Sequence, residues 1–145
     1  MKIKEFQKQL KSRKIDFALF YNLDSMNSDA DMVYFSGYNG IGALIIPKDK
    51  KPFLMVPEME CERAKNSKIK VYKWGKKKKM FEFILHIINK NSIKKRKIGI
   101  NKSAFTLNIY KLFKKSFKKI KVEDISSLCE KSREIKTNEE IKKIR

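Results

Sequence analysis

Apolar residues in this chain follow two spacings, one typical of helices and the other typical of strands. Three stretches place apolar side chains three or four positions apart, as on one face of a helix. We therefore predict helices near residues 2–13, 80–88 and 103–117. In the first of these, Ile3 and Phe6 stand among Lys, Glu and Gln residues, which indicates a surface helix. In the third, Ser103 is the predicted N-cap.

Short apolar runs bounded by turn residues predict the strands. Residues 17–21 have no polar face, so we expect a strand that is buried on both sides of a sheet. The other predicted strands are residues 32–35, 43–46, 53–56, 69–74, 97–100 and 120–122. Gly, Asn, Asp and Pro residues separate the first three runs of this list, so we interpret residues 32–56 as two successive hairpins.

The order of these elements predicts the fold class. A short helix is expected after the hairpins, because Pro57 suits a first helical position and acidic residues precede basic ones beyond it. In the second half, strands alternate with helices, which calls for parallel strands joined by right-handed crossovers. The sequence therefore predicts an α/β fold with three layers: a mixed, mostly parallel sheet of about six strands with helices on both faces.

The last residues predict the start of a further helix. Residues 137–140 (TNEE) form a capping box, and two isoleucines then begin an apolar stripe. The stripe stops at Arg145, after about two turns, which is too short for a stable isolated helix. We therefore expect residues 1–132 to form one domain, and residues 133–145 to be a linker and the first helix of another.

Charge is the compositional outlier. The formal net charge is +20, and most of the cations are lysine. Two basic runs, residues 76–79 and 94–97, fall between predicted elements, where we expect solvated connections. Arg is scarce, although sequence-reading nucleic-acid surfaces favour it, so we expect no specific nucleic-acid partner. The alternative is a free-standing basic α/β module that binds RNA or DNA through these two runs.

The remaining composition excludes other classes. Cys61 and Cys129 are expected to be reduced thiols, and His86 is the only histidine, so a zinc site has almost no ligands. The longest apolar runs are strand-sized, and the Lys-rich N-terminus lacks the apolar region of a secretory signal. We expect a cytoplasmic protein without a membrane partner.

Several motifs carry a resemblance to a known family. They are residues 31–38 (DMVYFSGY), 45–47 (IIP), 56–60 (VPEME) and 133–141 (REIKTNEEI). Their order and spacing resemble the amino-terminal domain of the Xaa-Pro aminopeptidase, prolidase and creatinase family, which implies an RNase-H-like fold. Residues 27–31 are closer to the aminopeptidases and residues 56–60 to the prolidases, so the resemblance leaves aminopeptidase or dipeptidase activity open.

The resemblance implies that catalysis belongs to a different part of the protein. Family members are similar in having a carboxy-terminal pita-bread domain that binds two divalent metal ions (Mn, Co or Zn) and hydrolyses the bond before proline. No segment of this sequence supplies such ligands, since Glu58, Glu60 and Glu62 are explained by their place at a helix start. We expect this chain alone to be inactive, and the parent protein to be a metal-dependent hydrolase.

The resemblance also implies a role for particular residues. Such amino-terminal domains help to pair subunits as homodimers and wall one side of the active site, which limits it to short proline-containing peptides. Asp31 is the candidate wall residue, because an acid there could pair with an Arg or a substrate amine; the alternative is that it caps a strand end. The further candidates are Tyr34, Ser36, Gly37 and Tyr38.

Overall fold

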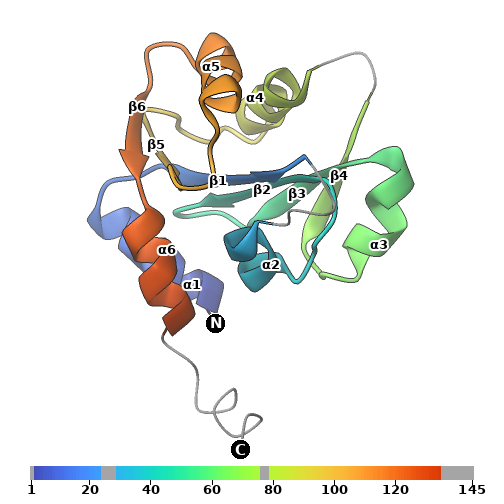
Figure 1. Cartoon of the computed structure of the whole chain (residues 1–145), viewed down its shortest axis with the longest axis horizontal. Helices are drawn as coiled ribbons and strands as arrows, with labels where there is room; N and C mark the ends of the chain where they lie inside the picture. Colours follow the sequence, from blue (N-terminus) through green and yellow to red (C-terminus); the bar gives the residue numbers. More distant parts are fainter. Residues whose placement is uncertain (1, 24–28, 76–78, 135–145) are drawn as a thin grey trace, which may run out of the picture.

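A computed structural model describes residues 2–23, 29–75 and 79–134 of the chain. It has three layers, with one sheet between two layers of helices (Figure 1). The strands are β1 (Phe17–Asn22), β2 (Gly42–Pro47), β3 (Phe53–Pro57), β4 (Lys70–Trp74), β5 (Lys97–Ile100) and β6 (Lys121–Asp124). The helices are α1 (Lys2–Ser12), α2 (Ala30–Ser36), the 3-10 turn η1 (Glu58–Glu60), α3 (Cys61–Lys65), α4 (Met80–Lys90), α5 (Leu107–Ser116) and α6 (Ser126–Glu134).

The sheet is mixed and mostly parallel, as predicted. Its strand order is β4-β3-β2-β1-β5-β6. Strand β2 is antiparallel to its neighbours β1 and β3, whereas the other three pairings are parallel. Five strands therefore run in one direction, and β2 alone runs against them. As a result, the carboxyl ends of β1 and β5 meet at one edge of the sheet, and the amino ends of β3 and β4 lie at the opposite edge.

Alternate residues of the buried strands fill two hydrophobic cores. Phe17, Leu19 and Tyr21 of β1 face the layer of α4 and α5. Ala18 and Phe20 face the layer of α1, α2, α3 and α6. Every residue of β1 is buried, which confirms the prediction of a strand covered on both sides. This two-sided burial fixes the register, because a slip by one residue would exchange the two cores.

Asp16, just before β1, is a buried carboxylate that joins three segments. Its Oδ2 accepts hydrogen bonds from the main-chain nitrogens of Arg96 (2.7 Å) and Lys97 (3.2 Å), and its Oδ1 lies 3.2 Å from Lys48 Nζ. Burial pushes the pKa of Asp16 upward, but these donors outweigh it and hold the pKa below its ordinary value. The ionised carboxylate therefore fits the fold.

One predicted strand was wrong. Residues 32–35 lie within helix α2, so the first of the two predicted hairpins does not exist, whereas the second is the antiparallel pair β2 and β3. Asp29 caps the N-terminus of α2, and Gly37 ends it in the left-handed conformation at φ 74°. Met32 and Phe35, three positions apart, bury one face of this helix in the core. Caps and packing here prevail over the β propensity of a short aromatic run.

One further prediction was wrong in the second half of the chain, the N-cap of the helix predicted near residues 103–117. Helix α5 begins at Leu107, and its N-cap is Thr106, whose side chain accepts from Ile109 N at 3.2 Å. Ser103 is not the cap, because its main-chain nitrogen donates to Asn101 Oδ1 (3.0 Å) in the turn before the helix. Helix α6 was not predicted, and residue 133, the expected linker start, lies in its last turn.

Some predictions fall outside the described residues. These are the capping box at residues 137–140 and most of the basic run at residues 76–79. The other basic run, residues 94–97, does lead from a turn into β5. Among the helices in the described part of the chain, none is long and apolar enough to cross a membrane.

Candidate functional site

A hollow of about 470 Å³ lies at the edge of the sheet where the parallel strands β1 and β5 end. Asn22 and Asn101, which end and follow these strands, lie on its wall. The beginning of α2 supplies Asp29 and Asp31, and the end of α6 supplies Arg133. Sites in α/β proteins commonly lie at the carboxyl ends of parallel strands, and this hollow follows that rule.

Asp29 holds the beginning of α2 at the rim of the hollow. Its Oδ1 accepts from the main-chain nitrogens of Asp31 (2.8 Å) and Met32 (3.0 Å). These are two of the donors that a helix leaves unpaired at its N-terminus. Burial, together with the nearby Asp31 carboxylate, raises the pKa of Asp29 despite these hydrogen bonds and the attraction of Arg133.

Asp31 is a buried carboxylate held by two distant parts of the chain. The residue is 2% exposed. Asn101 Nδ2 donates to its Oδ2 at 2.6 Å, and Arg133 Nε lies 3.1 Å from its Oδ1. The contact with Arg133 is electrostatic, because among the described residues neither of these two atoms has a well-aligned hydrogen bond. Asp31 therefore pairs with an arginine and does not cap a strand end.

A buried thiol lies close to these carboxylates. Cys129 of α6 is fully buried, and its burial and the nearby Asp31 and Asp29 raise the pKa of its thiol. A thiol in such surroundings stays protonated and is a poor nucleophile. Cys129 is thus a free thiol in the core, whereas Cys61 is a free thiol that is partly exposed.

The other four predicted wall residues do not surround this hollow. The Tyr34 hydroxyl donates to the main-chain oxygen of Ser132 (2.9 Å), which ties α2 to α6. Ser36 Oγ donates to Met32 O (2.6 Å) and accepts from Tyr38 N (3.0 Å), so it closes the end of α2. Gly37 is the C-cap of that helix.

Tyr38 belongs to a separate set of contacts, just after the C-terminus of α2. The residue is buried, its hydroxyl donates to Ile41 O (2.6 Å), and Arg63 lies over its ring. Burial and the nearby Glu60 raise the pKa of Tyr38 to about 12. Of the five predicted wall residues, Asp31 alone lines the hollow.

The sequence interpretation missed the partners of Asp31. Asn101 and Arg133 are far from Asp31 along the chain, and only the parallel pairing of β1 with β5 and the packing of α2 against α6 bring them together. Asp29, which accepts from Asp31 N, could have been found from the sequence, since an acid directly before the start of a helix is a common N-cap.

The described residues offer no cluster of metal-ligating side chains. They contain no group of three or more His, Cys, Asp and Glu side chains that could hold a metal ion. The three glutamates predicted to favour a helix start, Glu58, Glu60 and Glu62, lie in η1 and α3, where they pair with Lys73, Arg63 and Lys65, respectively. Asp29 and Asp31 are the only carboxylates that line the hollow among the described residues, and both are engaged within the fold, so the ligand set of a dinuclear metal site does not fit it.

Comparison with known proteins agrees with the fold. Residues 2–135 match the Creatinase/Prolidase N-terminal domain family. The Xaa-Pro dipeptidase of Lactobacillus helveticus is 28% identical over 99% of this chain, which spans 40% of that relative's length.

Solved structures show the same domain both alone and within longer chains. The N-terminal domain of the Xaa-Pro dipeptidase from Lactobacillus brevis superposes with a TM-score of 0.75 at 16% identity, over 90% of this chain and 99% of that one. The prolidase from Pyrococcus horikoshii gives a TM-score of 0.73 at 28% identity, over 97% of this chain and 37% of that one. The fold described above is therefore the N-terminal domain of Xaa-Pro dipeptidase-like proteins.

Proposed function

Because this chain belongs to the creatinase/prolidase N-terminal domain family, we propose that it is the noncatalytic domain of a metal-dependent Xaa-Pro dipeptidase. In this role it restricts the active site to short peptides and helps to pair subunits as a homodimer. Dipeptidase activity is preferred to aminopeptidase activity, because the Lactobacillus relative that covers almost the whole chain is an Xaa-Pro dipeptidase.

The observation that carries the proposal is the position of Asp31. Its carboxylate is fixed by Asn101 and Arg133 at the wall of an open hollow, at the strand ends where ligands of α/β proteins bind. A dipeptide carries a free ammonium group and a free carboxylate close together. An acid and an arginine side by side are complementary to these two charges, and a longer peptide would separate the charges beyond the reach of the pair.

The divalent metal ions required for hydrolysis belong to the catalytic part of such an enzyme. In the hollow, Asp29 is engaged in a helix cap and Asp31 in an ion pair, and the described residues contain no group of three or more His, Cys, Asp and Glu side chains that could hold a metal ion. The domain acts by shape and charge, through the hollow and its Asp31–Arg133 pair.

The test compares this chain with the product of its complete gene. Both are assayed on an Xaa-Pro dipeptide and on a longer Xaa-Pro peptide, with added Mn²⁺, Co²⁺ or Zn²⁺. We expect the complete product to cleave the dipeptide and the 145-residue chain to cleave neither. A complete product without metal-dependent hydrolysis would overturn the proposal.

The wall role is tested by Asp31→Asn in the complete product. This substitution keeps the shape of the side chain and its contact with Asn101, but removes the charge. We expect kcat/KM for the dipeptide to fall about tenfold, which is the weight of one charged hydrogen bond, with a smaller change for the longer peptide. Asp49→Asn, an exposed acid outside the hollow, is the matched control. For each protein we take the ratio of kcat/KM for the dipeptide to kcat/KM for the longer peptide. If this ratio is the same in the wild type and in Asp31→Asn, Asp31 does not restrict access.

A further inference from the structure

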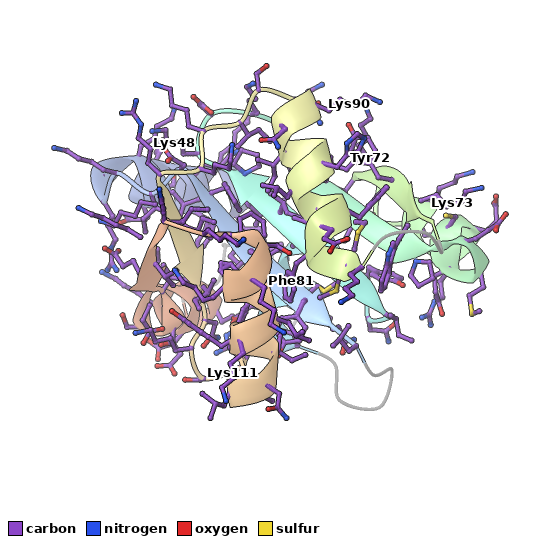
Figure 2. All side chains as sticks on the ribbon, turned by 90° about the horizontal axis from the view of Figure 1, so that it is seen from above. Lys48, Tyr72, Lys73, Phe81, Lys90 and Lys111 are labelled. Carbon is purple, nitrogen blue, oxygen red and sulfur yellow. The ribbon has the colours of Figure 1, made fainter. Side chains whose placement is uncertain are left out.

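The positive charge of the chain is concentrated in one continuous part. Residues 64–122 contain 20 of the 36 Lys and Arg residues, but only one of the 16 acidic residues, Glu82. This part includes the edge strand β4 and both helices of one layer, α4 and α5. Figure 2 looks down on that layer, with Lys90 and Lys111 on its two helices. Elsewhere in the chain, acidic and basic residues are nearly balanced.

Residues of this basic part and of the segment 50–53 together line a second hollow of about 330 Å³ at the amino ends of β3 and β4. Four lysines line it, and no carboxylate among the described residues does so. The lysines are Lys50, Lys51, Lys68 and Lys70. Apolar side chains, among them Ile69 and Ile93, form another part of its surface. The hollow therefore combines a strongly positive rim with an apolar wall.

Two neutral hydrogen-bonding groups are fixed inside this hollow. Asn91 Nδ2 donates to the Tyr72 hydroxyl (3.3 Å) and to Ile87 O (2.8 Å). The Tyr72 ring packs edge-on against Phe53, with the centroids 5.3 Å apart, which holds the hydroxyl in place. Because this hydroxyl accepts from Asn91, its own proton is available to donate to a bound ligand.

Among the described residues, no carboxylate forms an ion pair with the lysines that line this hollow. Lys70 Nζ lies 5.0 Å from the centre of the Tyr72 ring. Burial pushes the pKa of Tyr72 upward, but Asn91 and the ammonium groups of Lys70 and Lys90 outweigh it and lower that pKa. Lys50 donates to the main-chain oxygens of Asn91 and Ser92, so it is held at the rim by neutral carbonyl groups. The field in the hollow is therefore positive at the hydroxyl.

We propose that this hollow binds a phosphate group, with the Tyr72 hydroxyl and the Lys70 ammonium as its direct donors. Lysine ammonium groups are compact charges with three donors each, which suits the many oxygens of phosphate. The volume and the apolar wall leave room for a diphosphate or for the organic part of a phosphorylated small molecule. The site lies at the edge of the sheet opposite Asp31, so it is independent of the proposed peptidase role.

The experiment is calorimetric titration of the 145-residue chain with inorganic pyrophosphate in about 150 mM NaCl, where diffuse attraction is screened. We expect saturable binding with one site. Tyr72→Phe keeps the ring packing and removes the donor, and Lys70→Gln removes one charge; each should weaken binding about tenfold. Lys111→Gln on α5 makes the same charge change outside the hollow and should alter affinity by less than about twofold. Thermal melts confirm that each variant is folded.

Three results would overturn the proposal. The first is that pyrophosphate does not saturate the wild-type chain. The second is that Lys111→Gln weakens binding as much as Lys70→Gln does, which indicates diffuse attraction only. The third comes from titration with a single-stranded oligonucleotide: tighter binding than pyrophosphate, with equal losses in both lysine variants, would indicate a polyanion surface in place of a phosphate site.

Discussion

The two hollows of this domain lie at opposite ends of the same sheet and differ in their charged side chains. At the carboxyl ends of the strands, Asp29 and Asp31 stand at the N-terminus of α2. At the amino ends, Lys50 donates to carbonyl oxygens at the C-terminus of α4. The acids complement the positive end of one helix dipole, and the lysine complements the negative end of the other. Part of the charge difference between the hollows therefore stabilises the two helices.

The two hollows differ in the charge that remains beyond what complements the neighbouring helix end. Arg133 compensates the Asp31 carboxylate, and the first hollow is nearly balanced. No carboxylate of the described residues lines the second hollow, so the charge of Lys51, Lys68 and Lys70 exceeds what the α4 terminus requires. A balanced pair serves to position a group, whereas an unbalanced cluster attracts an anion. The following predictions test this contrast, from the largest expected effect to the smallest.

Arg133→Met should destabilise the domain by about 3 kcal/mol, because it leaves the buried Asp31 carboxylate without its counter-charge. The measurement is urea denaturation at neutral pH. The double variant Asp31→Asn with Arg133→Met removes both charges and should recover most of that loss. If Arg133→Met is as stable as the wild type, Arg133 does not compensate Asp31 and the first hollow is not balanced.

Asp16→Asn should destabilise the domain by about 2 kcal/mol at pH 7, since the carboxylate accepts from Arg96 N, Lys97 N and Lys48 Nζ at the amino ends of the strands. The folded-state pKa of Asp16 is lowered, so its contribution is fully present above the ordinary value of 3.8. It is lost as the pH falls through the lower folded-state pKa. The difference between variant and wild type should therefore shrink in denaturation experiments below pH 3.8. A pH-independent difference would contradict this.

Asp29 should show the opposite pH dependence. Its folded-state pKa is raised, so the wild type loses stability as the pH rises from 3.8 through that higher value. Asp29→Asn keeps the cap but has no carboxyl group to ionise, so it lacks this loss. Its free energy of unfolding at pH 7 should equal or exceed that of the wild type. Asp29→Ala removes the cap and should cost about 1 kcal/mol. Guanidinium denaturation of both variants at pH 4 and pH 7 checks the sign; a stabilised Ala variant would contradict the capping role.

The sequence predicted the architecture well wherever apolar periodicity extended over several turns or a whole strand. The helix near residues 80–88 and the buried strand near residues 17–21 are examples, and both are confirmed. Helix α2 has seven residues, so its two buried side chains, Met32 and Phe35, show less than two turns of periodicity. Its caps, Asp29 and Gly37, were the better signal.

The site could be predicted only in part, because its contacts are not local. The resemblance singled out Asp31, and the structure places it at the hollow. Its partners are Asn101, which directly follows β5, and Arg133 of α6. Helix α6 has a short apolar stripe, Leu128 and Cys129, with Ile125 just before its first residue. Residues such as these are brought together by strand order, which a single sequence does not reveal.

The two outer strands of the sheet have a consequence for how copies of this chain meet. Both β4 and β6 leave one row of main-chain hydrogen-bonding groups without a neighbouring strand in the sheet. Two exposed lysines, Lys70 and Lys73, mark the edge at β4, whereas β6 carries Lys121 together with the acidic Glu123 and Asp124. Pairing of two β4 edges would bring the lysines of both copies together, which disfavours extension of the sheet at that edge.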